Sequence, residues 1–329
     1  MKVAVGISGG VDSAAAAIIL KEQGFDVIGV TMTLGRHGED VQLQEARDAA
    51  GRLGIELQVF DFSEDWRREV AEYIKATYLA GHTPNPCVRC NEFVKFSLLP
   101  RAAFALGCEW FATGHYAQLK EGRLMRAADR SKDQSYFLYR VDPEILKKTI
   151  FPLGAMTKQQ VRELVLSRGI EMAQKPDSQD FCGGDAMNFV GEEDRVGKIV
   201  DLNGKVLGLH RGFWHYTVGK RKGLGIGGGI PYYVVRLDAR RNEVIVGYRD
   251  DAVKTEFEIA DICRHGDTLE GELRVKVRSA GEPHGPVFIE RKPGNCAKII
   301  CPSGIAGIAP GQSAVFYRED TLVGGGIIV

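Results

Sequence analysis

The sequence predicts an α/β protein in which an N-terminal parallel-sheet domain is followed by two small all-β units, the last of them a β-barrel. Two observations lead to this prediction. Residues 1 to about 190 alternate short apolar runs with segments of helical periodicity, which is typical of a parallel sheet covered by helices on both faces. After about residue 197 the helical patterns end, and glycine-rich turns separate short β-like runs. We therefore expect domains at 1–196, 197–250 and 251–329.

The N-terminal domain should contain four strands joined by helices. The predicted strands are Val3–Ile7, Asp26–Thr33, Glu56–Phe60 and Trp110–Thr113. The predicted helices cover residues 13–23, 41–53, 63–80, 91–106 and 157–168. In the helix at 41–53, for example, apolar residues recur at helical spacing and Gly54 follows as a stop signal. The later units should contain the strands Lys198–Asp201, Val206–Leu209, Tyr232–Leu237, Glu243–Gly247, Glu272–Arg278, Ala297–Cys301 and Ser313–Tyr317.

The composition excludes several classes of protein. Of the 329 residues, 44% are apolar and 26% are charged, as in ordinary globular domains. No apolar run approaches the ~20 residues needed to span a bilayer, and the first residues lack the pattern of a signal peptide. Seven cysteines, an odd number in a long chain, argue against a secreted disulfide framework. We expect a cytoplasmic monomer with no membrane partner.

The segment between the first predicted strand and helix has the features of a phosphate-binding loop. It reads Ser8-Gly9-Gly10-Val11-Asp12-Ser13. A strand that ends in a glycine-rich turn before a helix presents backbone amides at the positive end of the helix dipole. The glycines let phosphate oxygens approach the backbone, and the serines add hydroxyl donors. Asp12 either caps the helix or helps to hold Mg²⁺. The lysine of the Gly-x-x-x-x-Gly-Lys-Ser/Thr loop is absent.

Three cysteines lie near predicted turns. Pro84-Asn85-Pro86 predicts a stiff extended loop that leads into Cys87 and Cys90, and Asn91 is expected to open the next helix. Cys182 follows in the turn "KPDSQDFCGGD". A thiol at a helix N-terminus is reactive because the dipole favours its thiolate. The residues alone leave three interpretations open: unreactive thiols, a zinc site without an obvious fourth ligand, or sulfur transfer between a persulfide and a resolving thiol.

The Ser-Gly-Gly-x-Asp-Ser pattern resembles that of the PP-loop pyrophosphatases, which cleave ATP between its α and β phosphates. Further motifs follow in order: "NPCVRCN" at 85–91, "ATGHYA" at 112–117, "DRSKDQSYFL" at 129–138, "DSQDFC" at 177–182 and "GKRKGLGIGGG" at 219–229. Together they resemble the tRNA-specific 2-thiouridylases over essentially the whole chain. The resemblance implies a PP-loop domain of the adenine nucleotide alpha hydrolase type. It also implies that sulfur is placed on C2 of the wobble uridine, position 34, in the anticodon stem-loop of tRNA.

The resemblance further implies roles for individual residues. ATP would be held by Gly6, Ile7, Ser8, Gly9, Gly10, Val11, Asp12, Ser13, Met32 and Gly114. The tRNA would contact Asn85, Pro86, Cys87, Lys132, Asp133, Gln134, Arg278 and Ser279, the last standing where the family has Tyr. Cys90 would be the nucleophile and Cys182 the persulfide carrier. Because Cys87 is also a cysteine, the three thiolates are alternatively ligands of a [4Fe–4S] cluster whose fourth iron position binds sulfide.

The implied reaction has two stages. AMP passes from ATP to the C2 oxygen of uridine, which turns a poor leaving group into a good one and releases pyrophosphate. Sulfur on Cys182, supplied by a sulfur-donor protein, then attacks C2, AMP leaves, and Cys90 closes a disulfide with Cys182. In a variant order, Cys90 first releases sulfide, which attacks C2. Either order requires the base to leave its stack, which is inexpensive in an anticodon loop.

Attraction for tRNA must come from a local basic region, because the net charge of the chain is zero. Residues 198–241 contain nine lysines and arginines against two aspartates, with aromatic residues interleaved, and this favours an RNA contact over a plain solvated β surface. Here Gly223-x-Gly225-x-x-Gly228 matches a dinucleotide fingerprint by letter, but a strand, not a helix, should follow. Two rival functions remain: another PP-loop enzyme, namely an amide-forming synthetase or a thiolase for another tRNA position, and a non-catalytic RNA-binding module.

Overall fold

The structure, a computed structural model, describes residues 1–329 except residues 37, 170–189, 192, 228 and 267. Its contacts divide the chain into two compact units. Unit 1 comprises Met1–Val70, Cys87–Gly183 and Asp320–Leu322, and unit 2 comprises Ala71–Pro86, Gly184–Glu319 and Val323–Val329. The segment 71–86 therefore packs with the later β elements, although it precedes most of unit 1 in the sequence. No helix among the described residues is long and apolar enough to cross a membrane.

A parallel sheet forms the centre of unit 1. In spatial order its strands are β3 (Leu57–Asp61), β2 (Asp26–Thr33), β1 (Lys2–Gly6), β4 (Trp110–Ala112) and β7 (Thr149–Ile150), and neighbours pair in parallel. Residues 3–5 of the central strand β1 are fully buried, as expected for a strand with helices on both faces of its sheet. The predicted α/β fold class is confirmed.

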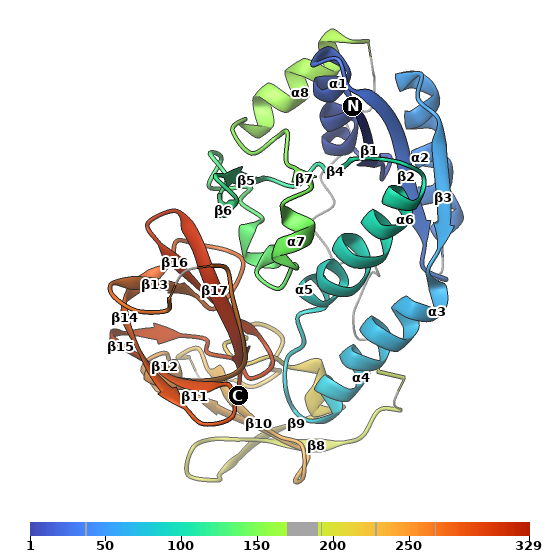
Figure 1. Ribbon diagram of the computed structural model, residues 1–329. Helices are drawn as coiled ribbons and strands as arrows, with labels where there is room; N and C mark the ends of the chain where they lie inside the picture. Colours follow the sequence, from blue (N-terminus) through green and yellow to red (C-terminus); the bar gives the residue numbers. More distant parts are fainter. Residues whose placement is uncertain (37, 170–189, 192, 228, 267) are drawn as a thin grey trace. The chain divides into compact units, whose positions relative to one another are not determined.

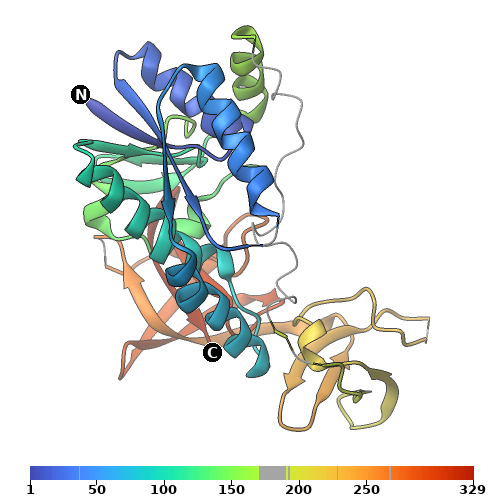
Figure 2. The ribbon, with the colours of Figure 1, turned by 90° about the vertical axis from the view of Figure 1, so that its right-hand side faces the viewer.

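The strand order determines which helices cover which face of this sheet. From β1 the chain passes through α1 (Val11–Glu22) to β2 and through α2 (Glu39–Leu53) to β3, and it then returns to β4 on the other side of β1. Right-handed crossovers therefore place α1 and α2 on one face and the unit 1 segments that lead to β4 on the other. α8 (Lys158–Ser167) packs beside α1 (Figure 1), and α2 runs along β2 (Figure 2). The unit 1 segments that lead to β4 are α3 (Ser63–Trp66), α5 (Pro86–Cys90), η2 (Asn91–Leu98) and α6 (Leu99–Ala105), whereas η1 (Arg67–Ala71) ends at the boundary with unit 2 and α4 (Glu72–Leu79) lies in unit 2.

A hairpin that the sequence did not predict completes unit 1. Its strands are β5 (Ala117–Lys120) and β6 (Arg123–Arg126), and Thr321 pairs with Met125 beside it. Two short helices, η3 (Ser135–Leu138) and α7 (Pro143–Leu146), connect this hairpin to β7. The hairpin places the turn at 129–134 next to the start of α8, because the amide of Lys158 donates to Asp129 Oδ2 at 3.0 Å.

Unit 2 contains two β assemblies. The smaller is a four-stranded sheet in the order β10 (Tyr233–Asp238), β11 (Glu243–Gly247), β8 (Gly197–Val200) and β9 (Val206–His210). Its apolar core includes side chains from η6 (Phe213–His215) and from α4. The short helix η7 (Asp250–Ala252) then leads into the second assembly.

The second assembly is a closed six-stranded barrel, which confirms the predicted C-terminal β-barrel. Its strands follow the order β12 (Val253–Arg264), β15 (Cys296–Ala306), β14 (His284–Lys292), β13 (Leu273–Lys276), β16 (Ser313–Arg318) and β17 (Thr321–Ile328). Pairing of β12 with β17 closes the barrel. Its interior is filled by apolar side chains such as those of Ile259, Val275, Ile299 and Phe316.

One local prediction is wrong. Asn91 does not open a helix, because the helix already begins at Pro86 and continues through α5, η2 and α6. Proline is favourable at the first helical position, where its missing N–H has no intrahelical acceptor. As a result, Cys87 and Cys90 lie inside a helix, followed directly by the π-helical segment η2.

Candidate active site

The predicted phosphate-binding loop connects β1 to α1, and its shape depends on Gly9. Gly9 has a φ of +78°, and a Cβ at this position would lie 2.6 Å from Cβ of Glu45 in α2. Both the backbone conformation and the close approach of α2 therefore require glycine here. The helix start at Gly10 has no side-chain cap, which leaves amides of the first turn of α1 available to an anion.

The two serines of this loop stabilise the loop itself. The hydroxyl of Ser13 donates to the carbonyl oxygen of Gly10 at 2.9 Å and accepts from the amide of Ser8 at 3.2 Å. Ser13 is buried and Ser8 is exposed. Ser13 thus fixes the turn from within, and Ser8 presents its hydroxyl at the surface of the loop.

The loop after β4 meets the phosphate loop at the point where the strand order of the sheet reverses, between β1 and β4. β1 lies between β2 and β4, so the loops that leave β1 and β4 turn to opposite faces and open a crevice, the usual ligand site of such sheets. A Cβ on Gly114, just after β4, would lie 2.7 Å from the carbonyl carbon of Asp12. Met32, near the end of β2, is partly exposed at the same carboxyl edge.

Asp12 is held by two side chains that the sequence did not connect with it. Both of its oxygens accept from Nζ of Lys158, at 2.7 and 2.8 Å, and Oδ1 also accepts from the hydroxyl of Tyr116 at 2.8 Å. The Lys158 side chain is 11% exposed. The sequence analysis did not single out this lysine, although its place in the first turn of a predicted helix, where the dipole disfavours a cation, is an unusual feature.

The carboxylate of Asp12 does not fit a magnesium ligand in this arrangement. Both oxygens already accept hydrogen bonds from the ammonium of Lys158. A divalent cation at the same oxygens would be repelled by that ammonium. The expectation that Asp12 helps to hold Mg²⁺ is therefore not supported by its contacts.

Cys87 and Cys90 share one face of α5, because they are three residues apart in a helix. Cys90 is 1% exposed, whereas Cys87 is partly exposed. Cys182, the predicted persulfide carrier, lies outside the described residues. Among the residues that the structure describes, no group of three or more histidine, cysteine or acidic side chains is arranged to hold a metal ion.

The loop that precedes Cys87 is anchored within unit 2. Nε2 of Gln312 donates to the carbonyl oxygens of Thr83 and Pro84, at 3.2 and 2.6 Å. The backbone amide of Asn85 is also fixed, because it donates to the hydroxyl of Tyr73 at 3.3 Å. Asn85 itself is buried. These contacts hold the predicted base-binding segment in a defined conformation up to Pro86.

The turn at Lys132, Asp133 and Gln134 combines structural and surface residues. The carboxylate of Asp133 is buried and accepts from Nε of Arg126 at 3.4 Å, and from the amide and hydroxyl of Ser135, each at 3.1 Å. Oε1 of Gln134 accepts from the amide of a neighbouring residue at 2.8 Å. Lys132 and Gln134 are both partly exposed, and since Oε1 of Gln134 already accepts a backbone hydrogen bond, Lys132 is the member of this turn best placed to reach an anionic ligand.

His115 borders the same loop as Gly114. Burial, and secondarily the charge of Lys95, lowers the pKa of His115 to about 3. Its ring packs against Phe96 and Phe151, and its Nδ1 lies 2.8 Å from Oγ1 of Thr113. The imidazole is therefore neutral at physiological pH.

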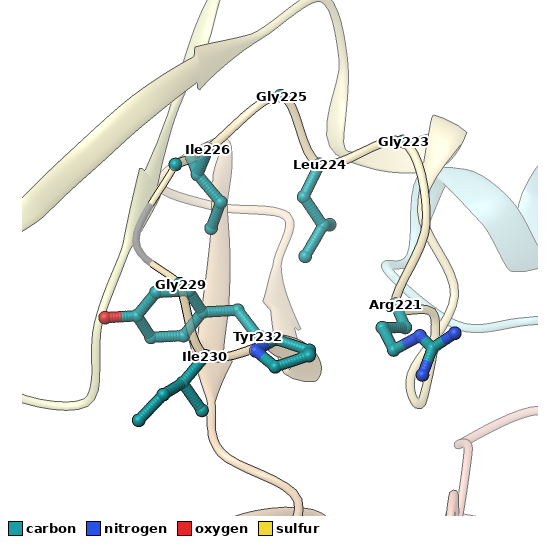
Figure 3. A pocket seen from close by; sticks show the side chains of 10 residues that line it. Arg221, Gly223, Leu224, Gly225, Ile226, Gly229, Ile230 and Tyr232 are labelled. Carbon is teal, nitrogen blue, oxygen red and sulfur yellow. The ribbon is translucent and has the colours of Figure 1, made fainter.

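The basic region at 198–241 surrounds an apolar core. Trp214 and Tyr216 are buried in that core, so they are not available to stack on RNA bases. Arg221 is exposed and borders a pocket of about 380 Å³ whose wall is the glycine-rich loop (Figure 3). The ring of Tyr232 lines this pocket and stacks on Tyr248, with centroids 5.2 Å apart. A strand, β10, follows the loop, which confirms that the loop is not a dinucleotide fingerprint.

Arg278 and Ser279 lie just after β13 of the barrel. Arg278 is exposed, and its Nη2 donates to the carbonyl oxygen of Ala306 at 2.8 Å. Ser279 is partly exposed. The pair thus lies at the surface of unit 2, with the arginine fixed to the barrel backbone.

Comparisons with known proteins agree with this domain order. Residues 1–183 match the tRNA methyl transferase HUP domain, residues 188–248 the tRNA methyl transferase PRC-barrel domain, and residues 255–328 the aminomethyltransferase beta-barrel domain. The tRNA-specific 2-thiouridylase MnmA of Endomicrobium trichonymphae is 39% identical over 100% of this chain and 99% of its own length. MnmA of Azorhizobium caulinodans is 43% identical over 100% of this chain and 92% of its own length.

Solved structures show a weak likeness, among them a 4-thiouridine synthetase–RNA complex with bound ATP, which has a TM-score of 0.40 and 20% identity over 55% of this chain and 44% of that chain. Fold and domain order define a protein with an N-terminal HUP domain, followed by a PRC-barrel domain and a C-terminal β-barrel domain. The family models carry methyltransferase names, but the relatives that align over the whole chain are thiouridylases. The chain belongs to the tRNA-specific 2-thiouridylase family.

Proposed function

We propose that this protein is a tRNA-uridine 2-sulfurtransferase that uses ATP to place sulfur on C2 of the wobble uridine. One combination of two features carries the proposal. The predicted phosphate-binding loop lies where the strand order of the sheet reverses, between β1 and β4. The relatives that align over the full chain are named tRNA-specific 2-thiouridylases. Neither feature alone specifies the reaction, because the fold hosts many acceptors and the names belong to the relatives.

The first stage is activation of the uridine C2 oxygen. That oxygen attacks the α phosphorus of ATP, the bond to the β-phosphate oxygen breaks, and pyrophosphate leaves. The amides of the first turn of α1 and the hydroxyl of Ser8 would hold the departing phosphates. Met32 and Gly114 would border the nucleotide, because both lie at the carboxyl edge of the sheet. This assignment of the ATP site rests on geometry and on the family resemblance.

The second stage is sulfur transfer, for which we favour a persulfide. The terminal sulfur of a persulfide on Cys182 attacks C2, and AMP leaves. The thiolate of Cys90 then attacks Sγ of Cys182, the bond to the transferred sulfur breaks, and the sulfur remains on C2 as the thione. A thiol reductant must then reduce the Cys90–Cys182 disulfide, and a sulfur-donor protein must reload Cys182. The alternative keeps Cys87, Cys90 and Cys182 as ligands of a [4Fe–4S] cluster.

The tRNA would contact both units. In unit 1 the partly exposed Lys132 would meet the backbone of the anticodon stem-loop. Cys87 of unit 1 would face the extruded base, together with Asn85 and Pro86, which end the segment 71–86 of unit 2. In unit 2 the exposed Arg221 and Arg278 would add phosphate contacts.

A direct test combines the purified protein with tRNA that lacks wobble thiolation, ATP with Mg²⁺, and a sulfur donor, and then maps the thiolated nucleosides. The expected result is 2-thiouridine at position 34 and one pyrophosphate per sulfur. Cys90→Ser and Cys182→Ser should stop thiolation, whereas the matched control Cys296→Ser, at a partly exposed cysteine of the barrel, should not. Thiolation at another position, or amide formation with both variants active, would overturn the proposal.

The two sulfur schemes make different predictions for the same preparation. Under the persulfide scheme, protein purified without oxygen shows no absorption of an iron–sulfur cluster, and mass spectrometry finds an added sulfur on Cys182. Under the cluster scheme, the visible absorption is present and is lost in Cys87→Ser as well as in Cys90→Ser.

A further inference from the structure

The phosphate loop carries no positive side chain of its own. Within residues 7–13 the charged residue is Asp12, and it stands in the first turn of α1. A carboxylate at that place opposes the approach of a polyphosphate, since both are anions. A loop that binds ATP through its triphosphate therefore needs a cation from elsewhere in the fold.

Lys158 supplies such a cation from the start of α8. Its ammonium spans both oxygens of Asp12, and it lies 5.7 Å from the ring centre of Tyr116. It belongs to unit 1 together with the loop, and it is separated from Asp12 by 146 positions in the chain. The contact therefore results from the packing of α8 beside α1 and not from sequence proximity.

The backbone around Lys158 is fixed by three separate contacts. Thr157 forms a capping box with Gln160, in which Oγ1 of Thr157 accepts from the amide of Gln160 and Oε1 of Gln160 accepts from the amide of Thr157. The amide of Lys158 donates to Asp129 Oδ2. These contacts hold the lysine in the first turn of α8, where the helix dipole is unfavourable to its charge. A position that costs helix stability and is nevertheless held by a capping box indicates a role at the site.

We propose that Lys158 is the phosphate-binding cation of this loop. Without nucleotide its ammonium neutralises Asp12, and with ATP bound it contacts the β- and γ-phosphates and afterwards the released pyrophosphate. The inference rests on the proposed function, because it assumes that the loop binds ATP. It replaces the expectation that Asp12 neutralises the phosphates through Mg²⁺.

The alternative is an ion pair that only joins α1 to α8. The exposure of the pair makes the two cases distinguishable. Lys158 is 11% exposed, but the Asp12 side chain is 34% exposed, so the pair borders solvent at the mouth of the loop. An ammonium at that border can move from one anion to another by rotation of its own side chain, without a change in the backbone.

The test compares Lys158→Met and Lys158→Arg with the wild-type chain by calorimetry, using ATP, inorganic pyrophosphate and AMP. Lys158→Met should weaken ATP and pyrophosphate by about tenfold or more, the usual effect of losing a hydrogen bond to a charged group. AMP, which lacks the β- and γ-phosphates, should bind within about twofold of wild type. Lys158→Arg should restore most of the pyrophosphate affinity, because it returns the charge.

The matched control is Lys147→Met, which removes an exposed lysine paired with Glu144 in the same unit. It should leave all three affinities unchanged. Equal weakening of AMP and pyrophosphate by Lys158→Met, or no weakening of either, would overturn the role of Lys158. The proposed function fails differently: wild-type protein would then bind none of the three ligands, or would release no pyrophosphate with tRNA.

Discussion

Asp133→Asn tests whether the turn at 132–134 contacts tRNA through its aspartate or is only shaped by it. The carboxylate accepts from Nε of Arg126, from the amide of Ala127 at 3.1 Å, and from the amide and hydroxyl of Ser135. The side chains of Asp133 and Arg126 are 1% and 5% exposed. Asparagine keeps the shape, but it removes the charge and turns one acceptor into a donor that faces other donors.

The size of the effect follows from these contacts. Removing one partner of a buried ion pair costs about 3–5 kcal/mol, because the other charge stays buried. Here Arg126 also lies 3.8 Å from Asp320, which is partly exposed and offsets some of the loss. We therefore expect a cost near the lower limit, about 3 kcal/mol, which is roughly a hundredfold change in a local unfolding equilibrium.

Hydrogen exchange of the amides of Ala127 and Ser135, read by mass spectrometry, is the appropriate assay because it reports on unit 1 alone. Both amides should exchange roughly a hundredfold faster in Asp133→Asn. The affinity of the folded variant for tRNA should stay within about twofold of wild type, and the exposed control Glu144→Gln should change neither quantity. Unchanged exchange together with weakened tRNA binding would show that Asp133 contacts the RNA directly, and would refute this reasoning.

Three further predictions concern the loop, the RNA surface and pH. Gly114→Ala places a Cβ 2.7 Å from the carbonyl carbon of Asp12, so the phosphate loop must shift, and the ATP affinity measured by calorimetry should fall by about tenfold or more. The control Gly51→Ala, whose Cβ would have no neighbour within 4 Å, should bind ATP with the wild-type affinity. Arg221→Gln should weaken tRNA binding uniformly across sequences and reduce the slope of log K against log salt by about one in filter-binding titrations; an unchanged slope would exclude a phosphate contact. The pKa of His115 is about 3, against 6.5 for the ordinary group, so the unfolded chain binds the extra proton between these values. The stability of unit 1 should then fall by up to about 1.4 kcal/mol per pH unit as pH drops from 6.5 towards 3, and urea titrations of His115→Gln should lose that slope.

The strands and helices of the sheet domain were predictable because burial on both faces gives them a simple pattern. Residues 3–5 are fully buried in β1, and they appear in the sequence as a continuous apolar run. Gly54 ends α2 in the left-handed conformation, with φ of +60°, as its place after the last apolar residue indicated. In these elements the local signal and the tertiary packing agree.

Three barrel strands, β12, β14 and β17, were missed, and the structure explains the case of β17. β17 contains Gly324-Gly325-Gly326, and glycine weakens a strand signal. A Cβ on Gly324 would lie 2.4 Å from the carbonyl oxygen of Cys263, and one on Gly326 would lie 3.0 Å from that of Ala260. The glycines are thus required by the close approach of β12, a contact between distant segments that no local pattern reveals.

The candidate site shows the same limit. The glycines and serines of the loop were identified because they are contiguous and their chemistry is local. The helix start at Pro86, which places Cys87 and Cys90 on one helical face, was not predicted, because an Asn-Pro pair is equally typical of a loop. Lys158 was missed because its partner lies in another helix.

The charges around the site also show why a chain of zero net charge is suited to bind two polyanions. Asp133 is neutralised inside the protein by Arg126, and Asp12 by Lys158, so neither aspartate presents an uncompensated field to ATP or RNA. Exposed cations such as Arg221 face solvent, where they attract phosphate over about 10 Å at ordinary salt. Balance over the whole molecule therefore coexists with local attraction, because Asp12 and Asp133 are paired while cations such as Arg221 are exposed at the surface.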